Sequence, residues 1–230
     1  MSHQMEEVVL FLLRWIHFGA GITWIGLLYY FNFVQIPYFG ETKTGLGTGE
    51  FRKLVDRALW WFRWGAMLTF LSGIAIIGIR AAQGAMSEHW GVAISAGAVF
   101  GILMFLNVWL VIWPNQKIVI ASADNVAGGG AADPAAAGAG ARAFLASRTN
   151  TLFSVPMLFF MGAASHLSVL NCSGNHAALG AVTLLALAIE GNALMGKKGE
   201  GASKLLDQHG NVLWAGLAVT AASAAMFVLI

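Results

Sequence analysis

"LLRWIHFGAGITWIGLLYYFNFVQIP", residues 12–37, contains one charged residue, Arg14, and one histidine, His17, in an otherwise largely apolar run. A helix needs roughly 20 mainly apolar residues to cross a hydrocarbon layer about 30 Å thick, and this run is long enough. It follows the acidic pair Glu6 and Glu7 and is about twice as long as the apolar core of a signal peptide. The stretch therefore predicts a retained membrane-spanning helix.

The composition of the whole chain agrees with a membrane protein. Hydrophobic residues make up 58% of the 230 residues and charged residues only 10%, which is far from the balance of a soluble domain. The net charge of +2 is small and no Lys/Arg block is present, so nucleic acid is excluded as a partner and the lipid bilayer is expected instead. The single cysteine, Cys172, excludes an internal disulfide, and without a Cys-x-x-Cys-His motif no c-type haem is attached covalently.

The hydropathy pattern predicts an all-α integral membrane protein, a single domain over residues 1–230. Lipid offers no hydrogen-bond partners, so each spanning segment must pair its own backbone N–H and C=O groups, as a helix does. Six stretches are long and apolar enough to span: 8–37, 59–81, 90–113, 149–170, 177–195 and 210–229. Residues 51–64 alternate apolar and charged side chains and predict a short interfacial amphipathic helix. The Gly/Ala-rich stretch 123–141 predicts a flexible cytoplasmic loop.

The basic residues predict the orientation of the bundle. Nearly all lysines and arginines flank the first, third and fifth connections, and only Arg14 and Arg80 fall on the other side. Loops rich in Lys and Arg stay in the cytoplasm. Both termini are therefore expected in the periplasm, and the protein is expected in the bacterial cytoplasmic (inner) membrane as a multi-pass protein.

Four of the six histidines gather on the outer side of this topology: His17, His89, His166 and His176. His17 and His166 each lie about one turn inside the outer interface, on different helices. An ionisable side chain within a span costs free energy unless it has a partner, so it is a functional candidate by default.

A b-type haem held by two imidazoles from two helices satisfies both His17 and His166. The helix around His17 has Gly21 at i+4 and Trp24 at i+7, and Gly162 precedes His166 by one turn. Small residues beside a histidine leave room for a flat ring. The sequence therefore predicts a haem site with these five residues.

Arg14 precedes His17 by three residues and lies nearer the water, where a guanidinium can pair with a haem propionate. Alternatives remain open. His89 or His176 can replace one of the two ligands, or serve as solvated or capping residues at helix ends. Any single intramembrane histidine can also be a packing residue, and imidazoles suit zinc or copper as well as haem.

Other polar residues also fall within the predicted spans: Asn32, Asn107, Glu190 and Asn192. Glu190 is either a proton-relay group or a buried acid that is neutral or paired, for instance with Arg63.

Three motifs carry a resemblance to a known family. They are "RWIHFGAGITWIGLLYYFNFVQIPYF" at 14–39, "NVWLVIWPNQK" at 107–117 and "RTNTLFSVPMLFFM" at 148–161. In this order they resemble the membrane domain at the N-terminus of bacterial membrane-bound urate oxidases (urate hydroxylases). More distantly, the pattern of His17, Trp24 and Gly26 is similar to a group of haem-binding membrane proteins that includes a bacterial protoporphyrinogen oxidase and copper-resistance proteins. The stretch 90–109 lacks the lysine that this oxidase group uses, which argues against oxidation of a haem precursor.

The first resemblance implies that His17 is a functional position and that the cofactor is haem b. It also implies a c-type cytochrome that receives electrons, here a separate periplasmic protein or another redox partner. The first hypothesis is therefore a haem-binding membrane protein in electron transfer. Two alternatives remain open: an enzyme that oxidises urate or a similar purine with a separate cytochrome c, and a cofactor-free accessory subunit of a larger respiratory or oxidase complex.

Overall fold

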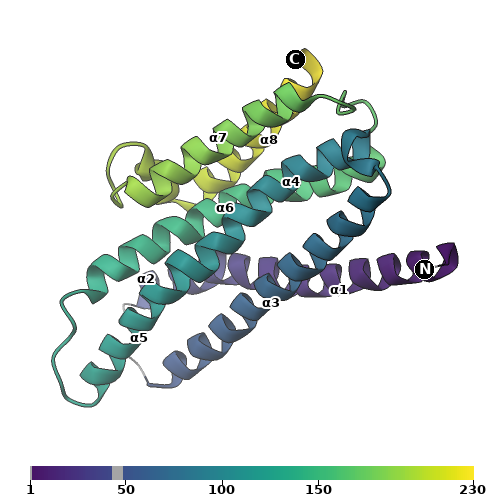
Figure 1. The fold of residues 1–230 in the computed structure, drawn as a ribbon. Coiled ribbons are helices and arrows are strands. Elements are labelled where there is room, and N and C mark those ends of the chain that lie inside the picture. Colours follow the sequence, from purple (N-terminus) through teal and green to yellow (C-terminus); the bar gives the residue numbers. More distant parts are fainter. Residues whose placement is uncertain (1, 43–48) are drawn as a thin grey trace.

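The computed structural model describes residues 2–42 and 49–230, and all regular structure in these ranges is helical. The first half contains α1 (His3–Tyr29), η1 (Tyr30–Gln35), α2 (Ile36–Thr42), α3 (Gly49–Ala82), η3 (Ala85–Ser87), α4 (His89–Leu106), η4 (Asn107–Ile112) and α5 (Trp113–Ala127). The second half contains α6 (Ala136–His166), α7 (His176–Met195), η5 (Gly201–Leu206) and α8 (His209–Leu229). The expected all-α architecture is thereby confirmed (Figure 1).

Within the described residues, five helical segments are long and apolar enough to cross a membrane. They are His3–Thr42, Arg52–Ala82, His89–Ala127, His176–Met195 and His209–Leu229. The sixth predicted span corresponds to α6, which is longer than expected and carries polar residues along its middle. The protein is therefore a multi-pass membrane protein with a less apolar helix at its centre.

Helix α6 occupies the centre because it packs against helices on several sides. Helices α4, α5, α7 and α8 all contact it, and its residues from Leu145 to Ser154 are buried except for half-buried Ser147. Helices α1 and α3 form an antiparallel pair on one side of α4 and α6, and α7 and α8 lie on the other side (Figure 1). A polar stretch of α6 is therefore shielded from lipid by its neighbours.

The bundle has two ends, a terminal end and a basic end. The terminal end holds both chain termini and the α3–α4 and α6–α7 connections (Figure 1). The basic end holds the α5–α6 and α7–α8 connections and most of the lysines and arginines. At the basic end Arg52 of α3 pairs with Asp124 of α5. Which end faces the cytoplasm stays a prediction.

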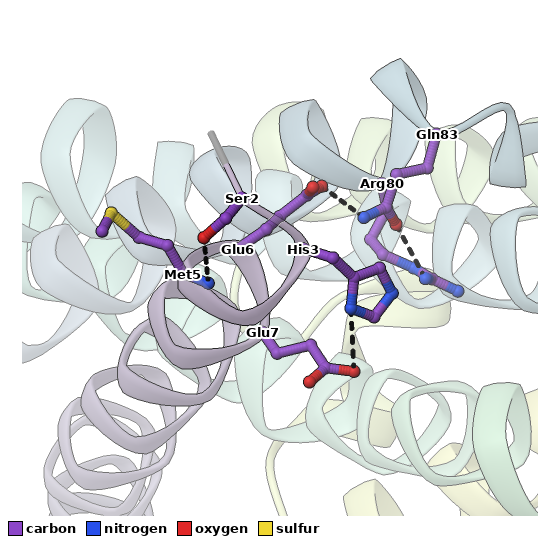
Figure 2. Close-up of polar contacts among 7 residues, drawn as sticks. All are labelled: Ser2, His3, Met5, Glu6, Glu7, Arg80 and Gln83. Atoms are coloured by element: carbon purple, nitrogen blue, oxygen red, sulfur yellow. Dashed lines mark hydrogen bonds and ion pairs between the residues drawn. The ribbon is translucent and has the colours of Figure 1, made fainter.

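At the terminal end, polar contacts join the start of α1 to the end of α3 (Figure 2). The amide nitrogen of Gln83 donates to the Glu6 carboxylate, and Arg80 Nη1 donates to Gln83 Oε1 at 2.8 Å. His3 Nδ1 lies 3.7 Å from Glu7 Oε1 on the same helix. These contacts fix the register of α1 on α3, which also positions His17 further along α1.

Two sequence-based boundaries need correction. The amphipathic segment 51–64 belongs to the first turns of α3 and is continuous with the span. The predicted loop 123–141 shortens to 128–135, because α5 extends to Ala127 and α6 begins at Ala136. Alanine is the best helix former, so an alanine-rich stretch continues both helices instead of separating them. The flexibility and cytoplasmic location of the shorter loop stay predictions.

Two π-helical segments, η1 and η4, interrupt the long helices, and each precedes a proline, Pro37 or Pro114. Proline lacks an N–H and clashes with the carbonyl one turn earlier, and a wider turn relieves that clash. Each segment also carries a buried asparagine, Asn32 in η1 and Asn107 in η4. Because π-bulges are frequent at functional sites, these two asparagines are candidates for a site.

Candidate functional site

His17 is half-buried on α1 and faces α3. Its Nδ1 lies 3.1 Å from Ser72 Oγ, and the Ser72 hydroxyl donates to Leu68 O at 2.7 Å. Because the Ser72 hydroxyl donates to that carbonyl, its oxygen can accept from His17 Nδ1 in the tautomer that carries a proton on this nitrogen. Gly73 packs against the ring, where a Cβ atom would lie only 3.1 Å from His17 Cε1. The imidazole is therefore oriented by its contacts with α3.

The residues predicted around His17 occupy different environments. Arg14 is exposed on α1, and the Cβ position of Gly21 has the Thr69 methyl group at 4.0 Å as its nearest neighbour. Trp24 is only 2% exposed and belongs to the hydrophobic core. Its indole N–H is buried without an acceptor among the described residues. Trp24 therefore packs in the core, and its part in a haem site stays a prediction, while Gly21 leaves space beside the α1–α3 contact.

His166 is the last residue of α6 and is exposed, and Gly162 one turn earlier has no atom within 4 Å of its Cβ position. The hydrogen bond of His17 goes to Ser72 of α3, 3.1 Å away. The pairing of His17 and His166 on one haem stays a prediction.

The two other outer histidines also lie at the terminal end. His89 Nε2 is 3.3 Å from Ala163 O, and His176 is exposed at the start of α7. Among residues 2–42 and 49–230, no group of three or more His, Cys, Asp or Glu side chains is arranged to hold a metal ion. The zinc or copper alternative therefore depends on the sequence alone.

The middle of the bundle contains a buried polar network that joins three helical segments. Asn107 Nδ2 donates to Asn150 Oδ1 at 2.9 Å and to Glu190 Oε2 at 3.0 Å. Asn150 Nδ2 in turn donates to Met104 O at 2.9 Å. All three polar residues are buried: Asn107 is 1% exposed, Asn150 is 0% exposed and Glu190 is 7% exposed. The network links η4, α6 and α7 through hydrogen bonds between side-chain amide and carboxyl groups.

A second set of hydrogen bonds joins α1 and η1 to α6. Asn32 Nδ2 donates to Leu28 O and to Ser147 Oγ, both at 2.9 Å. The hydroxyl groups of Tyr29 and Ser154 are 2.8 Å apart. The three motifs that carry the family resemblance therefore meet around α6.

Sequence reasoning singled out Asn32, Asn107 and Glu190 but missed Asn150. The signal was present in "SRTNT" at 147–151, a polar run in the middle of a predicted span. The proposed pairing of Glu190 with Arg63 is wrong, because the Arg63 guanidinium lies over the Trp113 ring at 3.7 Å and Asn107 bonds Glu190.

These features define a multi-pass helical membrane protein whose central helix carries a buried polar network. The family model described as urate oxidase N-terminal matches residues 80–226, most of the chain, and the protein belongs to this family. No curated protein and no solved structure matches the chain significantly. The matched range contains the network of Asn107, Asn150 and Glu190, whereas His17 and Ser72 precede it. The resemblance to the membrane domain of urate oxidases is confirmed, and the more distant likeness to other haem proteins stays a prediction.

Proposed function

We propose that the protein is an electron-transfer component of a urate oxidase-type system in the bacterial cytoplasmic membrane, with His17 as an axial ligand of a b-type haem. The observation that carries the proposal is the contact of His17 Nδ1 with Ser72 Oγ at 3.1 Å, with Gly73 packed against the ring. When bound, such a haem supplies a one-electron carrier whose potential depends on its ligands and surroundings.

The chain's own side chains support one ligand of this site. Ser72 accepts from His17 Nδ1, a partner that orients a ligating imidazole and raises its basicity. Gly21 and Gly73 keep bulky side chains away from the ring. His166 is proposed as the second ligand and Arg14 as the partner of a propionate, both from the sequence.

The electron acceptor in this proposal is a periplasmic c-type cytochrome or another redox partner, within a larger membrane complex where one exists. The family's name favours a second candidate, in which the chain itself oxidises urate or a similar purine. The buried carboxyl of Glu190, hydrogen-bonded by Asn107, is the group such a reaction would use to take up a proton.

The test of the first candidate is the reduced-minus-oxidised absorption spectrum of the purified protein. A b-type α-band is expected, and His17→Ala should abolish or shift it. Ser72→Ala should keep the band but weaken haem retention by about 10–100-fold, the usual effect of losing the partner of a ligand. His3→Ala is the matched control, because His3 is exposed at the start of the same helix as His17. A protein without the band in all forms would overturn the proposal and leave the cofactor-free subunit.

His166→Ala tests the second ligand separately. Loss or displacement of the α-band would support His166, and an unchanged spectrum would remove it from the site. The enzyme candidate requires urate consumption with added oxidised cytochrome c. Haem without turnover would favour electron transfer alone.

A further inference from the structure

A cavity of about 240 Å³ lies at the basic end between η1, α2, α3, α5 and α6. Four phenylalanines line it: Phe31, Phe39, Phe62 and Phe144. Its volume is below the range of about 300–1,000 Å³ for drug-sized ligands, so it holds a one- or two-ring molecule. Flat aromatic walls favour a planar occupant.

Two side-chain amide oxygens, one in the cavity wall and one beside it, have no hydrogen-bond donor among the described residues. Gln35 lines the cavity, and its Oε1 is buried without a donor among the described residues. Asn32 Oδ1 is unpartnered in the same way, and the Asn32 amide donates to Ser147, which also lines the cavity. A buried acceptor without a donor is unfavourable. A ligand in the cavity that brings an N–H or O–H group would satisfy Gln35 Oε1.

Two cationic side chains lie beside Phe144, and of these Lys198 lines the cavity. Lys198 Nζ lies 4.1 Å and the Arg148 guanidinium carbon 5.1 Å from the centroid of this ring. Arg148 is 2% exposed, and its Nε and Nη1 have no acceptor among the described residues. None of the described residues that line the cavity is acidic. This wall favours a ligand oxygen that carries negative charge or free lone pairs.

We propose that this cavity binds a small planar ring that donates a hydrogen bond to Gln35 Oε1 and presents an oxygen to Lys198. Two sources share this chemistry: the head group of a hydroquinone from the bilayer and an oxidised purine such as urate from the aqueous side. In this inference the bound ring is the electron donor for the proposed haem. That role of the cavity rests on the proposed function. Binding itself is measured without reference to haem.

A steric block tests the site without removing a structural contact. A Cβ at Gly140 would meet only Val119 Cγ2, at 3.7 Å, and Gly140 lines the cavity. Gly140→Leu should fill the cavity while favouring the helix, because glycine is a poor helix former. Gly138→Leu is the matched control on the same helix, outside the cavity.

Binding is measured on the full chain in detergent by equilibrium dialysis with urate, and by the shift in melting temperature with a short-tailed hydroquinone. At least one of the two probes should bind, Gly140→Leu should reduce that binding at least ten-fold, and Gly138→Leu should not.

Substitutions of the polar groups separate the two sources of the ring. Gln35→Leu should weaken binding of either probe about ten-fold, because one bond to a buried acceptor is lost. Lys198→Ala should weaken urate, an anion, more than the neutral hydroquinone, and Lys197→Ala is its control. Binding of urate alone assigns the purine, and binding of the hydroquinone alone assigns the lipid-soluble ring.

The proposal is overturned when neither probe binds, or when Gly140→Leu binds as well as Gly138→Leu. The haem spectrum of the same variants distinguishes this failure from that of the proposed function. A protein that shows the haem band but binds neither ring would refute the cavity site alone. A protein that binds a ring but shows no haem band would refute the haem site alone.

Discussion

Replacing Asn107 by leucine tests whether the buried network stabilises the bundle. The Asn107 amide is the shared donor to Asn150 Oδ1 and Glu190 Oε2, at 2.9 and 3.0 Å. Leucine has a similar size and no polar group, so Asn107→Leu removes both bonds with little change in packing. The two oxygens then remain buried without this donor.

Two scales bound the expected loss of unfolding free energy. An unsatisfied buried group costs about 1–3 kcal/mol, which gives about 2–6 kcal/mol for two acceptors. Hydrogen bonds between membrane helices average about 0.6 kcal/mol and reach about 1.7, which gives about 1–3.5 kcal/mol for two. The ranges overlap, and Asn107→Leu is expected to cost about 2–3 kcal/mol.

The assay is reversible unfolding in mixed micelles of increasing dodecyl sulfate, followed by far-UV circular dichroism. Asn192→Leu on α7 is the control, since its half-buried side chain makes no hydrogen bond with the described residues. It should stay within about 0.5 kcal/mol of the parent protein. The double variant Asn107→Leu/Glu190→Leu should lose less unfolding free energy than the sum of the two single variants. The reason is that the double variant has no buried carboxyl group left without its donor. Equal stability of Asn107→Leu and Asn192→Leu would refute the reasoning.

Two further predictions concern packing and a thiol. Gly216→Ala should lose about 1–3 kcal/mol in the same assay, because its Cβ would lie 2.7 Å from Val155 Cγ2 and 2.9 Å from Leu152 O. Gly180→Ala, with nothing within 4 Å, should be neutral or gain up to about 1 kcal/mol, and the opposite order would contradict the packing. Burial raises the pKa of the Cys172 thiol, so its thiolate is scarcer near pH 8 than that of a free cysteine. Alkylation by a membrane-impermeant maleimide should therefore be slow at pH 8 and accelerate at higher pH, and a rate equal to that of the unfolded chain would contradict this.

The sequence predicts the helices well where apolar residues alone decide them. The stretches 177–195 and 210–229 correspond closely to α7 (His176–Met195) and α8 (His209–Leu229). The start of α6 was missed by 13 residues, from 149 to Ala136. Low-complexity Gly/Ala sequence lacks hydrophobic periodicity, yet alanine extends a helix once a neighbouring span nucleates it. Composition therefore located the spans but not the length of the central helix.

The candidate site was predicted only in part, for two physical reasons. A histidine within a span is visible in the sequence, but its contact with Ser72, 55 residues later, depends on the register of α1 against α3. Asn150 has the opposite problem. Its helix, α6, is less apolar than the five membrane-spanning segments, and other helices enclose it. A linear sequence does not show which polar residues the neighbouring helices cover.

The two proposed sites share one helical segment, and this spacing constrains how they would work together. Gln35 follows His17 by 18 residues along α1 and η1, a rise of about 27 Å at 1.5 Å per residue. The hydrocarbon core of a bilayer is about 30 Å thick. A ring at Gln35 and a haem at His17 would therefore lie near opposite faces of the membrane, the ring at the basic end and the haem toward the terminal end. With the basic end in the cytoplasm, as the distribution of lysine and arginine predicts, the ring site would lie on the cytoplasmic side and the haem on the side of a periplasmic acceptor. The opposite orientation would place the ring site beside the periplasm, and then a purine donor would have to be supplied from that side.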